Sequence, residues 1–222
     1  MLDEINFVGY IHASTKRDYV ARVVEHDKAE CAAVAKRFDR DYWDGDRQYG
    51  YGGYVYDGRW RKVAEAMAAH YSLVPGMRVL DVGCGKAHLL YELSRVVSGI
   101  EVVGIDISDY GLAHAKEEVR PFLKRATAQE IPFADNTFDF VYSMATLHNL
   151  KIFDLTQAIA EIARVGRGDT AYVMVESYRN EREKANLLYW QLTCESFYSP
   201  EEWTWLFRQN GYTGDYGCIY FE

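Results

Sequence analysis

From residue 77 onward, short apolar runs alternate with longer segments in which apolar residues recur at helical spacing. The β-branched and aromatic runs predict strands at 78–82, 101–106, 122–126, 138–143 and 171–175. The segments between them predict helices at 87–97, 109–119 and 153–165. Strands that alternate with helices in this way are typical of βαβ units. The pattern therefore predicts an α/β domain with a doubly wound, mostly parallel sheet of six or seven strands.

The end of the chain predicts two more helices and a closing strand. One helix is expected over 181–193. A second begins at Ser199-Pro200-Glu201-Glu202, where Ser caps the helix, Pro takes its first position and acidic residues occupy its first turn. Residues 212–221 predict the strand that closes the sheet.

The pattern is less regular before residue 75. Helices are expected over 14–38, with Ser14 or Thr15 as the cap, and over 57–71. Residues 42–56 lie between them and hold five Tyr and four Gly, which predicts an aromatic, flexible loop. We therefore expect one domain, in which 1–74 form a helical cap with a Tyr/Gly-rich lid and 75–222 form the core.

Composition narrows the classes of function. The chain has 222 residues, of which 49% are hydrophobic and 26% charged, as in ordinary globular proteins. Its 25 Lys and Arg against 33 Asp and Glu give a net charge of −8, which argues against nucleic acid as a partner. No apolar run reaches the roughly 18 residues of a membrane span, and the N-terminus lacks a basic signal region. Four dispersed cysteines without a CxxC pair predict no metal site and fit a cytoplasmic location.

A glycine-rich turn follows the first expected strand. In Asp81-x-Gly83-x-Gly85, glycines allow a ligand to approach the backbone, and the next helix offers free N–H groups. Dinucleotide-binding enzymes need a third glycine where His88 stands, so that fingerprint fails. We expect His88 to be exposed to solvent. Asp106 ends the second strand and can accept both hydroxyls of a ribose, although an Asp there is also a common helix cap.

At this point a resemblance becomes specific. VLDVGCG (79–85), VVGIDIS (102–108) and AQEIPFADNTFDFVYSMATLHNL (128–150) resemble the class I S-adenosylmethionine-dependent methyltransferases of the small-molecule type. The resemblance covers residues 75–178 and departs from the family pattern at Ala87 and Thr127, where Gly and Asp are common. It implies S-adenosylmethionine as cofactor, S-adenosylhomocysteine as product, and methyl transfer to O or N of a small molecule. The family usually closes with two strands, for which few residues remain here.

The resemblance also assigns roles to residues. It places Asp81, Gly83, Cys84, Gly85 and Ser143 around the methionine part of the cofactor. It places Asp106 on the ribose, Ile107 against the adenine, and Thr127, Ala128 and Gln129 at the adenine edge. These motifs do not identify the methyl acceptor, and they do not show whether the reaction needs a general base.

Candidate catalytic and acceptor-binding residues follow the later strands and the Tyr-rich stretch. His148 is a candidate for accepting a proton or binding the acceptor, and could instead be satisfied by neighbouring backbone. Glu176, the other catalytic candidate, could hold a cationic amine or could cap the following helix. Tyr51, Tyr54, Arg59 and Tyr178 are candidates for the lid and the acceptor pocket. Arg59 could bind a carboxylate or pair with Asp57 or Asp46.

Three other functions stay open. They are an NAD-dependent oxidoreductase, a protein or RNA methyltransferase, and a non-catalytic module that keeps the cofactor site. Cofactor titration separates the first from methyl transfer, and salt-dependent nucleic-acid binding would identify an RNA enzyme. The expected partner is a small-molecule substrate, with no membrane. A homodimer is one option that the sequence leaves open.

Overall fold

The computed structural model describes residues 2–13 and 17–222 of the chain. Its centre is a sheet of six parallel strands in the order β3-β2-β1-β4-β5-β6. The strands are β1 (Arg78–Val82), β2 (Glu101–Asp106), β3 (Leu123–Arg125), β4 (Phe140–Met144), β5 (Ala171–Glu176) and β6 (Asp215–Ile219). The predicted doubly wound α/β fold is confirmed, with six strands rather than seven.

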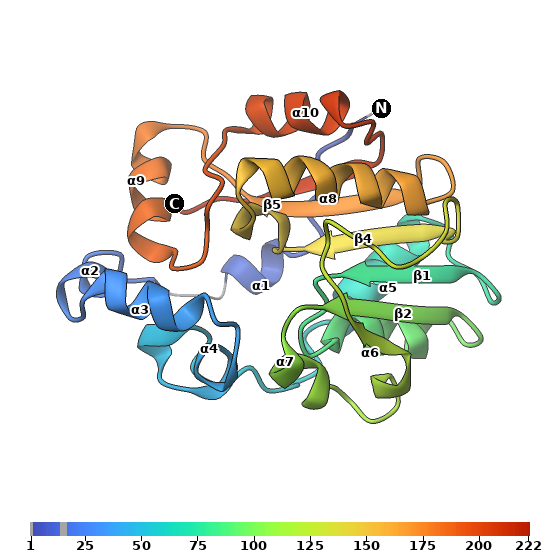
Figure 1. Ribbon diagram of the computed structural model, residues 1–222, viewed down its shortest axis with the longest axis horizontal. Helices are drawn as coiled ribbons and strands as arrows, with labels where there is room; N and C mark the ends of the chain where they lie inside the picture. The colour runs from blue at the N-terminus through green and yellow to red at the C-terminus, as the bar shows by residue number, and fades with distance from the viewer. Residues whose placement is uncertain (1, 14–16) are drawn as a thin grey trace.

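Helices cover both faces of this sheet (Figure 1). On one face, α5 (Arg61–His70) and α6 (His88–Val96) pack against side chains such as Val79 and Phe140. On the other face, α8 (Ile152–Val165) and α10 (Pro200–Gln209) pack against their strand neighbours, such as Leu80 and Val141. Successive strand residues point to opposite faces, so alternate positions of one strand enter the two cores. The structure therefore has three layers.

The last strand, β6, forms one edge of the sheet. β6 pairs with β5 in parallel, and α9 (Glu181–Trp190) and α10 form the connection between them. Residues 3–5 run along the free side of β6, where Ile5 N donates to Tyr216 O at 2.7 Å and Tyr216 N donates to Asp3 O at 3.0 Å. The N-terminal segment thus covers an edge that would otherwise expose unpaired backbone groups.

The cap differs from its prediction. Helices α1 (Gly9–Ala13), α2 (Ala21–Val24), α3 (Lys28–Ala35) and α4 (Arg40–Asp44) precede α5, with a 3-10 turn at Arg47–Tyr49. The single helix expected over 14–38 is therefore wrong, because the Asp27 side chain accepts from Ala29 N and Glu30 N and starts a new helix. The expected caps Ser14 and Thr15 lie outside the described residues. α4 falls partly inside the stretch predicted as a loop, because Asp39 caps it.

The remaining elements agree with prediction except in length. α7 (Asp109–Ala113) is shorter than the helix expected over 109–119, and it ends at His114, whose backbone N donates to Tyr110 O at 3.1 Å and whose ring contacts the same oxygen. The 3-10 turns at Arg120–Phe122 and Leu147–Asn149 precede β3 and α8. Strand order reverses between β1 and β4, so their carboxyl ends define the crevice in which ligands of such sheets bind.

Candidate functional site

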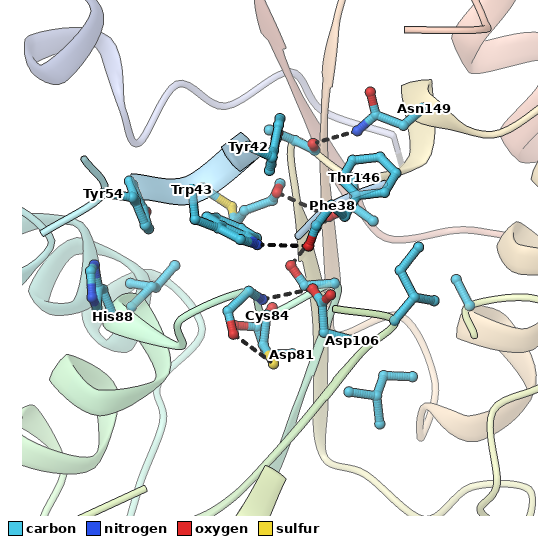
Figure 2. A pocket seen from close by; sticks show the side chains of 18 of the residues that line it. Phe38, Tyr42, Trp43, Tyr54, Asp81, Cys84, His88, Asp106, Thr146 and Asn149 are labelled. Atoms are coloured by element: carbon cyan, nitrogen blue, oxygen red, sulfur yellow. Dashed lines mark hydrogen bonds between the residues drawn. The ribbon is translucent and has the colours of Figure 1, made fainter. Parts of the chain in front are cut away.

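A cavity of about 300 Å³ lies at that crevice, between the carboxyl ends of the strands and the cap. All the residues that the resemblance assigned to the cofactor line it, except Ser143. They come from the turn after β1, the end of β2 and the segment after β3, and the aromatic residues of the cap complete the wall (Figure 2). Its volume is at the lower end of the range for small-molecule sites.

The turn after β1 approaches the cavity with bare backbone. Gly83 and Gly85 have φ of +83° and +55°. A Cβ on Gly83 would lie 2.2 Å from Thr146 Oγ1, and one on Gly85 would lie 2.5 Å from Trp43 Cη2. Both positions therefore require glycine for conformation and for space. Gly83 N donates to Ile105 O at 2.8 Å, which fixes the turn against β2.

Asp106 fastens this turn to the end of β2. Its Oδ2 accepts from Gly85 N and its Oδ1 accepts from Ser108 N, both at 2.7 Å. Each carboxylate oxygen has a second lone pair, so both can also accept from ligand hydroxyls. Burial raises the pKa of Asp106. The cap of α7 is the Ser108 side chain, which leaves Asp106 available to the cavity.

Asp81 has a carboxylate oxygen with no partner. Tyr142 donates to its Oδ2 at 2.9 Å, whereas Oδ1 is buried without a hydrogen bond. Burial raises the pKa of Asp81 to about 8. A buried acceptor in this state is costly unless a donor satisfies it. The cavity therefore suits a ligand with a cationic donor at this end.

Aromatic residues of the cap form the wall opposite the glycine turn. Trp43 is 8% exposed, donates from Nε1 to Ser108 Oγ at 2.9 Å and stacks on Tyr51. Lys86, next to the glycine turn, forms a 2.6 Å ion pair with Asp44. The Tyr/Gly-rich stretch thus lies against the cavity, held by a buried charge pair.

His88 is not exposed to solvent as expected. Its ring is 5% exposed and stacks on Tyr54 with centroids 4.8 Å apart, so the aromatic stretch covers it. Burial lowers the pKa of His88 to about 4. The imidazole is therefore a neutral part of the cavity wall.

A second cavity of about 370 Å³ adjoins the first. Seven residues line both cavities and form a shared wall between them: Tyr42, Tyr51, Tyr54, Trp60, Ala145, Asn149 and Met174. His148, Glu176 and Arg59 line only the second cavity. The two cavities therefore lie side by side, separated by this shared wall.

His148 and Glu176 form a buried pair in the second cavity. Glu176 N donates to His148 Nδ1 at 3.2 Å, so a neutral ring carries its proton on Nε2. Nε2 lies 3.4 Å from Glu176 Oε2, an oxygen that has no hydrogen-bond partner. Burial lowers the pKa of His148 to about 3 and raises that of Glu176 to about 8. Glu176 is thus the stronger base of the two.

Of the other candidate residues, Ser143 and Tyr178 line neither cavity, and Arg59 lines the second but is already paired. Ser143 is buried beneath the cavity and donates to Val82 O at 2.8 Å. Arg59 pairs with Asp57 at 2.5 Å. Tyr178 lines neither cavity and lies under the Lys184 ammonium, 4.8 Å from the ring centroid.

Several lining residues carried no recognisable signal in the sequence. Trp43 lines the first cavity, and Arg17, Arg22 and Arg47 line the second. The aromatic and glycine content around Trp43 indicated a lid but not which ring would face the glycine turn. The arginines come from separate segments of the cap, and only the fold brings them together.

The described residues form neither a membrane-spanning helix nor a metal-binding cluster. Among residues 2–13 and 17–222, no helix has both the length and the apolar character needed to cross a membrane. Within the same ranges, no group of three or more His, Cys, Asp or Glu is placed to hold a metal ion.

Comparison with known proteins shows that this chain is similar to methyltransferases. Residues 80–174 match the family model described as a methyltransferase domain. A demethylmenaquinone methyltransferase of Lysinibacillus sphaericus is 35% identical over 118 residues, which are 50% of this chain and 49% of the relative. An uncharacterized methyltransferase of Synechocystis is 30% identical over 120 residues, 54% of each protein. The chain spans about half the length of these curated relatives.

A solved structure gives the same picture of the fold. The crystal structure of the YcgJ protein from Bacillus subtilis superposes with a TM-score of 0.55 at 23% identity, over 66% of each chain. At this identity the likeness concerns the fold alone.

Proposed function

We propose that this chain, whose residues 80–174 match a methyltransferase domain, is a class I S-adenosylmethionine-dependent methyltransferase that transfers the methyl group of that cofactor to an oxygen or nitrogen of a small-molecule acceptor. The observation that carries the proposal is the unpartnered Oδ1 of Asp81 in the first cavity. The methionine part of the cofactor ends in an ammonium group, which is the cationic donor that this oxygen lacks.

The other residues of the first cavity fit the same cofactor. Asp106 offers free lone pairs for the ribose hydroxyls, and Gly83 and Gly85 line the part of the cavity to which we assign the methionine part. Ile107 and Gln129 also line the first cavity, and we assign them to the adenine. When bound, the cofactor supplies a methyl group on a positively charged sulfur, already activated for transfer.

The protein's part is alignment and the removal of water. The two cavities are neighbours that share a wall, so we place the acceptor in the second cavity, beside the cofactor in the first. Correct alignment is worth up to roughly 7–11 kcal/mol in favourable reactions. The aromatic rings of Trp43 and Tyr51 exclude water and can face the sulfonium, at about 0.5–2 kcal/mol per contact. Residues from the described part of segment 1–74 line both cavities, and we assign to this segment the role of a cap.

The second cavity supports an O or N acceptor, because such an atom must lose a proton. Glu176 lines that cavity and its Oε2 has no hydrogen-bond partner, so we assign proton removal to Glu176. His148 acts as a positioning residue, since its Nδ1 is engaged by Glu176 N and its pKa is too low for a base at neutral pH. The enclosed volume of about 370 Å³ supports a small molecule rather than a macromolecule.

Calorimetry tests the cofactor assignment, and mass spectrometry tests the reaction. S-adenosylhomocysteine should bind the wild-type protein and NAD should not, and Asp81→Asn should weaken the binding by about tenfold or more. Incubation of the protein with S-adenosylmethionine and small hydroxyl or amine compounds should yield products heavier by one methylene unit. Binding of NAD in place of S-adenosylhomocysteine would overturn the proposal, as would failure of S-adenosylhomocysteine to bind in the first cavity.

A further inference from the structure

Three arginines surround one indole ring in the second cavity. The guanidinium carbons of Arg17, Arg22 and Arg47 lie 5.7, 5.3 and 5.3 Å from the centroid of the Trp190 ring. All four residues line the cavity. Arg17 and Arg22 are partly buried, whereas Arg47 is more exposed and marks the solvent side. The Trp190 ring thus carries a cluster of positive charge inside an acidic protein.

None of the three arginines has a carboxylate within 4.0 Å in the part of the chain that the structure describes. Arg22 donates to the carbonyl oxygens of Trp190 and Arg47, at 3.3 and 2.9 Å. Arg17 contacts His12 Nδ1 at 3.1 Å through Nη2, and its Nε is buried without a partner. Backbone oxygens therefore satisfy part of the hydrogen-bonding capacity, and the charges stay uncompensated.

The rest of the cavity does not neutralise this cluster. The fourth arginine, Arg59, already pairs with Asp57 at 2.5 Å. Glu176 is the other acidic residue lining the cavity, and its ion-pair partner within 4.0 Å is His148 rather than any of the three arginines; burial raises its pKa to about 8, and the Arg17 charge opposes this rise. Burial and the nearby Arg47 charge lower the pKa of Arg22, which shows that the cluster is electrostatically costly. Like charges held together in this way are stabilised by an anion.

We propose that the methyl acceptor carries an anionic oxygen group, a carboxylate or a phosphate, that binds between Arg17, Arg22 and Arg47. This inference rests on the proposed function and names the class of its acceptor. The planar guanidinium groups offer paired N–H donors that match such oxygens. With the anion at Trp190, the nucleophilic O or N of the acceptor extends toward Glu176 and the shared wall. The cluster does not serve the cofactor carboxylate, because none of its members lines the first cavity.

Calorimetry on the protein saturated with S-adenosylhomocysteine tests this, with benzoate, its neutral analogue benzamide, and inorganic phosphate as probes. We expect benzoate or phosphate to bind at least tenfold more tightly than benzamide. Arg17→Met should weaken binding of the anion by about tenfold, through loss of a charge-assisted hydrogen bond, and leave benzamide and S-adenosylhomocysteine affinities unchanged. Arg59→Met is the matched control and should change anion affinity less than threefold, because Asp57 already neutralises Arg59. The tighter of the two anions distinguishes a carboxylate from a phosphate acceptor.

The outcomes separate this inference from the proposed function. If S-adenosylhomocysteine does not bind, the proposed function fails. If it binds while neither anion binds more tightly than benzamide, the proposed function stands and the anionic acceptor is overturned. Equal losses in Arg17→Met and Arg59→Met would also overturn it, since a general loss of positive charge would then explain the effect. Retained binding of S-adenosylhomocysteine reports that each variant is folded, and Arg17→Lys should recover part of the affinity for the anion.

Discussion

Tyr142 donates a hydrogen bond to one oxygen of Asp81, at 2.9 Å, and leaves the other oxygen buried and unpartnered. The two residues are register partners on β4 and β1, the strands between which the sheet order reverses. The pair therefore places an unsatisfied carboxylate oxygen at the crevice that such sheets use for ligands. A structural carboxylate would have both oxygens satisfied, so this relationship favours a ligand-binding role for Asp81.

Cofactor binding should release a proton from Asp81. Burial raises the pKa of Asp81 to about 8, so the carboxyl is mostly protonated at pH 7 without a ligand. The ammonium of the cofactor favours the carboxylate and lowers that pKa, so the proton leaves on binding. Calorimetry at pH 7 in bis-Tris and Tris buffers, which differ in ionisation enthalpy, should show release of up to about one proton. Asp81→Asn should remove the buffer dependence and Glu176→Gln should keep it. Identical heats in both buffers would contradict the role of Asp81.

The glycine turn should tolerate no side chain at Gly83. A Cβ there would lie 2.2 Å from Thr146 Oγ1 at a φ of +83°, so Gly83→Ala combines strain with a clash. Gly76 has a φ of +86°, and a Cβ added to it would have no neighbouring atom within 4 Å, so Gly76→Ala isolates the strain. We expect Gly83→Ala to weaken S-adenosylhomocysteine binding by at least tenfold and Gly76→Ala to leave it within about twofold. Equal affinities of the two variants in calorimetry would show that the turn does not touch the cofactor.

The sequence contains most of the information on the core of the fold. The runs around β1, β2 and β5 predicted those strands almost to the residue, because buried parallel strands are continuous apolar segments. Asp81, Gly83 and Asp106 were predicted at the cavity because a strand end followed by a glycine turn is a local pattern. Their individual roles toward the cofactor remain proposals.

The acceptor side could not be predicted in the same way. Arg17, Arg47 and Trp190 are far apart in the chain and meet because the cap packs beside α9. No spacing rule connects them. The burial of His88 could not be predicted from its neighbours in the sequence either, because it depends on Tyr54, which packs over the start of α6.

The ion pair between Lys86 and Asp44 should hold the cap against the cofactor cavity. Lys86 Nζ is buried, lies 2.6 Å from Asp44 Oδ2 and also donates to Tyr54 O at 3.0 Å. Asp44→Asn removes the partner of a buried charge, which typically costs about 3–5 kcal/mol, so the cap should open more often. Stopped-flow measurement should show S-adenosylhomocysteine dissociating at least tenfold faster. Asp135→Asn is the control, because its pair with Arg164 is exposed. Unchanged dissociation in Asp44→Asn would mean that this segment is a fixed wall.

Glu176 should set the pH dependence of both turnover and stability. Its pKa is raised to about 8 by burial, and the ionised form is the one that can take a proton from the acceptor. The kcat should therefore rise with pH through about 8 and level off above it. Glu176→Gln should lower kcat by about 10²–10⁴-fold and abolish this rise. The stability of the fold should change in the opposite direction and fall as pH rises. Folding raises the pKa of Glu176 from 4.5 to about 8, so its contribution to stability is complete below pH 4.5 and is lost as pH rises through about 8. Denaturant unfolding of the cofactor-free protein from pH 5 to 9 should show this loss, and Glu176→Gln should reduce it. A kcat that is flat between pH 6 and 9 in the wild type would exclude Glu176 as the base.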